Sequence, residues 1–147
     1  MATRKTVDQI LDKAADILEK DGWVTEVCYD SRTGGYCALG AIARAVYPKL
    51  PKSKLEDVAY VGNQDVDPTH REAVEFLARR IDRDVYDPAD TVYEYNDGLP
   101  KGFLGSYYDH KKDEFVFEYD EKVRLKSSRK VVKKLRDAAK AYRKKAA

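Results

Sequence analysis

Cys37 is the residue whose type and position are most suggestive of chemistry, because it follows a glycine pair at 34–35 and opens an apolar stretch. The dipole of a helix that begins at a cysteine stabilises the thiolate and lowers the pKa of the thiol. With a histidine base and an Asn or Asp to orient that base, such a thiolate makes a cysteine-dependent hydrolase. Asn96 and Asp97 could orient the base, so Cys37, Asn96 and Asp97 are the catalytic candidates.

The base that this chemistry needs is the weak part of the hypothesis. The chain has two histidines, and we expect His70 in the exposed first turn of a helix and His110 in a hairpin turn. A cysteine in an apolar helix also serves well as a small hydrophobic core residue. We therefore favour a core role for Cys37 and a binding protein over an enzyme.

Arg44 is the one charged side chain in the apolar stretch and shares a helical stripe with Cys37. A lone charge on such a helix needs a carboxylate partner or a route to solvent. Asp97 is the expected partner. The pair would be either an anion-binding site or a structural ion pair, and we favour the ion pair.

Motifs for metals and phosphates are missing from the chain. It has no Cys-x-x-Cys or His-Glu-x-x-His spacing, and the glycine pair after Thr33 is not followed by the Lys-Ser/Thr of a phosphate-binding loop. The sequence therefore predicts no metal site and no cofactor.

The element that positions these residues is the stretch from Cys37 to Tyr47. Its eleven residues are too few to span a bilayer, which takes about 20, and a helix that is apolar all round belongs in a core. Apolar residues at three- and four-residue intervals predict amphipathic helices over 6–21, 67–82 and 127–145, the last capped by Ser127 or Ser128. A short helix is expected over 54–60. We expect Trp23, just after the first helix, to cover that helix end and to need a hydrogen-bond partner for its indole.

Two segments have the pattern of β-strands. Residues 91–95 alternate like a short strand and are followed by the turn signature Asn96-Asp97-Gly98. Residues 103–109 and 114–119 predict an antiparallel hairpin with one aromatic face, adding one wall to the domain. The predicted fold is therefore α+β: a single, mainly helical domain over 1–147, built around a buried central helix, with a small antiparallel hairpin.

Charge is distributed unevenly along the chain. The net charge is +2, but residues 122–147 hold twelve Lys or Arg against Asp137 alone, so they carry +11 and the rest carries −9. Either the basic helix neutralises the acidic body, which we favour, or it binds nucleic acid. The nucleic-acid candidates are Arg129, Lys130, Lys133, Lys134 and Lys140.

Aromatic residues are more numerous than a core of this size needs: eleven Tyr, four Phe and one Trp. Tyrosine is enriched at binding hot spots, so this surplus favours a protein-binding function. The candidate binding residues are Arg44, Tyr95, Asn96, Asp97, Tyr107 and Tyr108.

Three blocks, Gly22-Trp23, Cys37-Ala38-Leu39-Gly40-Ala41-Ile42 and Asn96-Asp97, resemble a small domain family of unknown function from actinobacteria and their phages. The chain departs from that family's pattern in two ways. Tyr95 replaces the usual tryptophan, and the hairpin region, about 102–125, looks like an insertion before the last helix. The resemblance implies a phage-encoded accessory protein and transfers no activity.

Partner and compartment follow as expectations. No apolar segment follows the first residues, and two cysteines are too few for a disulfide framework, so we expect a cytoplasmic protein in a bacterial host with no membrane contact. A host or phage protein is the expected partner and nucleic acid the alternative. The sequence leaves the oligomeric state open.

Overall fold

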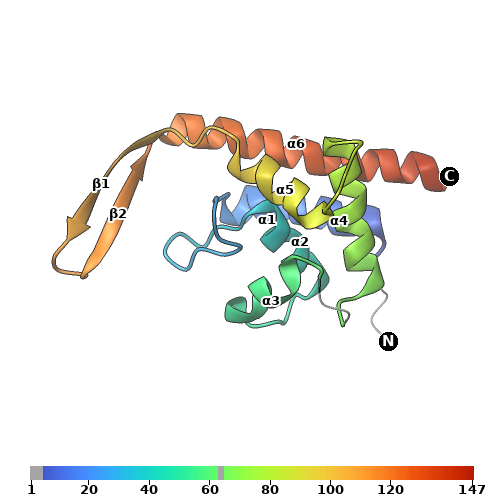
Figure 1. Ribbon diagram of the computed structural model, residues 1–147, viewed down its shortest axis with the longest axis horizontal. Coiled ribbons are helices and arrows are strands. Elements are labelled where there is room, and N and C mark those ends of the chain that lie inside the picture. Colours follow the sequence, from blue (N-terminus) through green and yellow to red (C-terminus); the bar gives the residue numbers. More distant parts are fainter. Residues whose placement is uncertain (1–4, 63–64) are drawn as a thin grey trace.

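The computed structural model describes residues 5–62 and 65–147. Within these residues a set of helices and one antiparallel hairpin form the mixed α+β domain that the sequence predicted (Figure 1). In chain order the elements are α1 (Val7–Asp21), α2 (Ala38–Val46), the 3-10 helix η1 (Lys52–Lys54), α3 (Leu55–Ala59), α4 (Pro68–Ile81), α5 (Pro88–Asp97), β1 (Phe103–Asp109), β2 (Glu114–Tyr119) and α6 (Glu121–Ala146).

Helix α2 is the buried centre of the domain, as predicted. All of its residues are buried except Arg44 and Val46. It packs against α1, α3, α4 and α5, whereas α6 packs along α1 and against α4. Helix α1 therefore packs against both α2 and α6. No helix in the described part of the chain is both long and apolar enough to cross a membrane.

Helix α1 begins and ends where the sequence indicated. The Thr6 backbone N–H donates to Gln9 Oε1 at 3.0 Å, and Gly22 ends the helix with a φ of 102°. Trp23 then turns back into the core and is 4% exposed. A left-handed φ at Gly22 is what allows this abrupt turn.

The segment 91–95 is helical, so the predicted strand and the tight turn after it were wrong. Asp87 Oδ1 accepts a hydrogen bond from the Asp90 N–H at 3.2 Å, and Pro88 occupies the first helical position. Val92 and Asn96 are both buried, and their spacing of four residues is that of a helix face. The Asp87 cap and the buried face formed by Val92 and Asn96 favour a helix here. The alternation of residues around Tyr93, which predicted a strand, is too short to prevent it.

Helix α6 begins at Glu121, six residues before the predicted start. Asp120 caps it, because its Oδ1 accepts from the N–H groups of Lys122 and Val123 at 2.9 and 3.4 Å. Ser127 lies inside the helix, is buried and donates a hydrogen bond to the carbonyl of Pro100. The predicted serine cap was wrong because Asp120 occupies a better position upstream.

The hairpin formed by β1 and β2 has the predicted strands and a register irregularity between Phe103 and Gly105. It extends from one end of the helical body (Figure 1). Among its apolar side chains five are exposed: Phe103, Leu104, Tyr107, Phe115 and Phe117. The hairpin therefore does not form a wall of the core, contrary to expectation.

Candidate functional site

Asn96 joins three segments of the body through its side-chain amide. Its Oδ1 accepts from Trp23 Nε1 at 2.7 Å and from the Ala38 N–H at 3.0 Å. Its Nδ2 donates to the Val24 carbonyl at 3.1 Å and to Asp97 Oδ1 at 3.0 Å. We call Asn96 with these four partners the Asn96 joint. Because Asn96 is 1% exposed and its amide is fully bonded, its evident role is to hold α5, the start of α2 and the chain after α1 together.

Glycines allow the backbones around the joint to approach closely. A Cβ added at Gly40 would lie 2.0 Å from the Cys28 carbonyl oxygen. One added at Gly35 would lie 3.1 Å from the carbonyl oxygen of Gly22 and 2.9 Å from a Val24 methyl group. The three sequence blocks that carry the family resemblance therefore meet in one packed region.

Cys37 caps α2 from inside this region. Its Sγ accepts from the Gly40 N–H at 3.3 Å, and its own N–H donates to the Cys28 carbonyl at 3.1 Å. Both cysteines are free thiols and both are 4% exposed. A hydrogen bond with the Cys28 thiol, together with burial, raises the pKa of Cys37 well above its usual value, while the same bond lowers the pKa of Cys28. A thiolate at Cys37, which the hydrolase hypothesis requires, is thus disfavoured, in agreement with the core role that we favoured from the sequence.

Neither histidine is placed as a base for Cys37. His70 is fully buried, against the expected exposed position, and packs edge-on against Tyr47 with ring centroids 5.4 Å apart. Burial lowers the pKa of His70 to about 4, so it is neutral at pH 7. His110 packs against Tyr108 in the hairpin. Within the described residues no imidazole bonds Cys37, so the cysteine–histidine pair of a hydrolase is not assembled there.

Arg44 does not pair with Asp97, so that prediction was wrong. Its Nη1 lies 2.7–3.0 Å from three backbone carbonyl oxygens that follow α2, those of Tyr47, Pro48 and Leu50. Asp97 instead accepts from the Glu26 N–H at 3.1 and 3.2 Å. Arg44 thereby satisfies carbonyls at the helix end, where a cation is also favoured by the dipole.

The remaining predicted binding residues occupy two different places. Tyr95 is half-buried on α5 with the Lys134 ammonium 5.6 Å from its ring centroid. On the hairpin, Tyr107 is 51% exposed, and half-buried Tyr108 packs against Phe115. The structure therefore brings Tyr95, Asn96 and Asp97 together on α5 and separates them from the hairpin tyrosines.

A groove lies between the hairpin and the chain segment 23–33. Its walls include Val27 and Tyr29 on one side and Val116 and Phe117 on the other. Arg32 Nη1 reaches the Phe115 carbonyl across it, at 3.5 Å. Exposed Val27 and Leu104 were not among the predicted site residues. Leu104 could have been suspected, since Gly105 beside it signals a strand irregularity.

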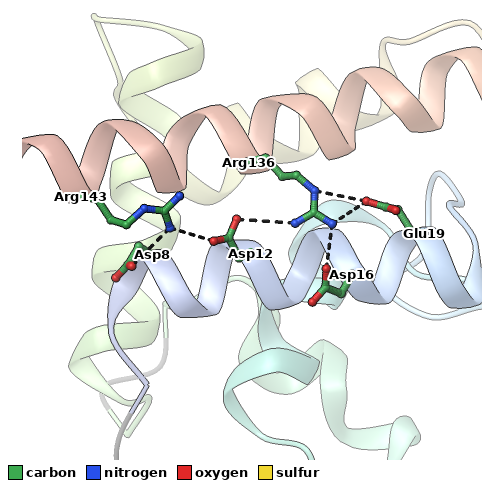
Figure 2. Close-up of polar contacts among 6 residues, drawn as sticks. All are labelled: Asp8, Asp12, Asp16, Glu19, Arg136 and Arg143. Carbon is green, nitrogen blue, oxygen red and sulfur yellow. Dashed lines mark hydrogen bonds and ion pairs between the residues drawn. The ribbon is translucent and has the colours of Figure 1, made fainter.

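The basic helix docks on the body through ion pairs with α1 (Figure 2). Arg136 lies 2.8 Å from Asp16 and 2.6 Å from Glu19, and Arg143 lies 2.8 Å from Asp12. Docking with partial neutralisation is therefore confirmed. Of the nucleic-acid candidates, Lys134 is half-buried, whereas Arg129, Lys130, Lys133 and Lys140 are exposed.

No group of three or more metal-ligating side chains gathers anywhere in the described residues. Comparison with curated proteins and with solved structures finds no match. A family model does match residues 2–101, so the matched part holds the whole Asn96 joint and ends just before β1. Since this is more than half of the chain, the protein belongs to the family of unknown function DUF6197.

Proposed function

We propose that this protein is a small accessory protein that acts by binding another protein through its hairpin. The observation that carries the proposal is the group of exposed apolar side chains there, of which Leu104 is 67%, Phe115 59% and Phe103 56% exposed. Exposed apolar side chains gathered in one place mark interaction sites more often than scattered ones do. We call residues 103–119 the hairpin arm.

The backbone of the hairpin arm supports the same proposal. β1 and β2 form a two-stranded sheet, and no other strand of the described chain pairs with either outer edge. Open edges offer N–H and C=O groups to an incoming strand, and edge addition is a common mode of peptide recognition. Tyr107 and Tyr108 are the predicted binding residues that this proposal retains.

The partner that we propose is a protein of a bacterial host or of its phage. The resemblance of the Gly-Trp, Cys-x-x-Gly-Ala-Ile and Asn-Asp blocks to an actinobacterial and actinophage family supports a phage-encoded protein that works in the host cytoplasm. Catalysis by Cys37 fits less well, because the thiol is buried and its pKa is raised.

The test compares partner capture by three forms of the protein. The wild-type chain, immobilised, should retain a specific protein from an actinobacterial lysate, and the double variant Phe115→Lys/Phe117→Lys should not. Tyr86→Lys is the matched control, since Tyr86 is fully exposed at a distance in sequence from the hairpin. Retention by the hairpin variant, loss in the control, or failure of the wild type to retain any protein would contradict the proposal.

A further inference from the structure

The outward face of α6 carries a row of cations that is interrupted by one acidic residue, Asp137. Positions 122, 126, 129, 130, 133, 140 and 144 recur at helical spacing and share one face of the helix. We call these seven residues the basic stripe: Lys122, Lys126, Arg129, Lys130, Lys133, Lys140 and Lys144. All seven are exposed, and at a rise of 1.5 Å per residue the stripe is about 33 Å long.

The acidic body leaves this stripe largely unneutralised. The carboxylates of α1 pair with Arg136 and Arg143 (Figure 2). Around the helix, both arginines lie between the basic stripe and the buried face of α6. On the outward face, Lys133 pairs with Asp137 at 2.6 Å. Among the described residues, the side chains of the other stripe cations form no hydrogen bond or ion pair.

The position and the composition of the basic stripe favour some anionic partners over others. The opposite face of α6 is committed to the core through residues such as Val131 and Leu135, so the helix cannot turn an apolar face into a membrane. The basic stripe itself contains no aromatic side chain on which single-stranded bases could stack. An exposed row of Lys and Arg side chains can neutralise several phosphates of a duplex at once.

We propose that the basic stripe binds the phosphate backbone of duplex DNA without reading its sequence. This surface is separate from the hairpin arm and does not depend on the proposed protein partner. Contacts confined to phosphates supply affinity and position but no base specificity. Neutralising about six phosphates would give a slope of about −5 for log K against log salt concentration.

The experiment measures binding of two fluorescent duplexes of unrelated sequence, about 20 base pairs long, by anisotropy from 50 to 200 mM NaCl. One strand of the duplex alone and vesicles of anionic lipid are measured as alternative ligands. The test variant is Lys126→Glu/Lys130→Glu/Lys140→Glu. The control Lys49→Glu/Lys54→Glu/Arg83→Glu changes net charge equally at exposed cations elsewhere. Circular dichroism and thermal unfolding verify that each variant is folded.

We expect the wild type to retain measurable affinity at 150 mM NaCl, with a slope near −5 that is the same for unrelated duplex sequences. The test variant should lose at least tenfold in affinity and flatten the slope by about 3, and the control should lose less than threefold. Equal losses in both variants, no wild-type binding at 150 mM, or tighter binding to a single strand or to vesicles of anionic lipid would overturn the proposal.

Discussion

The Asn96 joint buries its apolar side chains and bonds the backbone groups beside them, whereas the hairpin arm exposes its apolar side chains. In the joint, Trp23 is 4% exposed and its indole has a short hydrogen bond to Asn96. In the arm, Phe115 is 59% exposed, and no other strand of the described residues pairs with β1 or β2. Both regions drew attention in the sequence, one through its motif and the other through its aromatic residues. One is used to build the fold, and the other is available to a partner.

This difference shows that a distinctive sequence motif can reflect the packing of the fold rather than a catalytic site. Cys37 and Asn96 look like parts of a catalytic site in sequence, yet each one satisfies a buried backbone N–H group. Gly40, from the same motif as Cys37, allows α2 to approach the Cys28 carbonyl closely. The family match covers this region and not the hairpin arm. The family match therefore includes the Asn96 joint, whereas the hairpin arm, on which the proposed function depends, lies outside the matched residues.

Gly40→Ala tests the joint with the largest expected effect. Because the added Cβ would lie 2.0 Å from the Cys28 carbonyl oxygen, α2 and the preceding loop must move apart. We expect a loss of about 4 kcal/mol in the free energy of unfolding, measured by urea denaturation. Gly62→Ala is the control, since no described atom lies within 4 Å of its added Cβ. Equal stability of the two variants would contradict the close approach.

Leu135→Ala tests whether α6 belongs to the body. Leu135 is fully buried, so its truncation should reduce the free energy of unfolding by about 2–4 kcal/mol. Leu125→Ala is a control on the same helix, where the side chain is 52% exposed, and should cost less than about 0.5 kcal/mol. A small effect of Leu135→Ala would mean that the helix is detached in solution.

Asn96→Ala removes the amide at the centre of the joint. The Trp23 indole and the Ala38 N–H would be left buried without their acceptor, at a cost of about 2 kcal/mol. Trp23 is the only tryptophan, so its fluorescence reports on the joint directly. Denaturation followed by this signal should shift to lower urea concentration. An unchanged midpoint would mean that water replaces the amide without loss.

Much of the body could be predicted from local patterns. The apolar residues of α1 recur with the period of a helix that buries one face, and the apolar run of α2 is that of a helix buried on nearly all sides. The hairpin strands were predicted from the alternation of their residues. The sequence analysis missed the start of α6 and the helical state of 91–95. Both helices begin at an aspartate cap, Asp120 and Asp87, and a capping residue is recognised only once the helix after it is known. A short alternating segment such as 91–95 fits a helix face as well as a strand.

The arrangement of the candidate site was harder to predict. The need of Trp23 for a hydrogen-bond partner could be foreseen, but its partner is 73 residues away. The predicted partner of Arg44 was wrong because backbone carbonyls, which every residue has, leave no signal in the sequence. Exposure of the hairpin arm depends on how far it extends from the body, which strand alternation does not determine.

Phe115→Lys/Phe117→Lys should have the smallest effect on stability, in contrast to the joint variants. Both side chains are about half exposed and lie outside the core, so we expect a change of less than about 1 kcal/mol in the free energy of unfolding. Thermal unfolding by circular dichroism measures it. A loss as large as that of Asn96→Ala would show that the hairpin arm supports the fold rather than remaining available to a partner.

The central claim is that the most chemically suggestive residues form the core of the fold, and thiol reactivity tests it most directly. The rate of iodoacetamide labelling of Cys37 and Cys28 is measured in the native protein from pH 6 to pH 9 and compared with the rate in urea. Since both thiols are 4% exposed and the pKa of Cys37 is raised, native labelling should be far slower than labelling of the unfolded chain at every pH. Labelling of native Cys37 at pH 7 faster than that of a free thiol would contradict this account and favour the hydrolase.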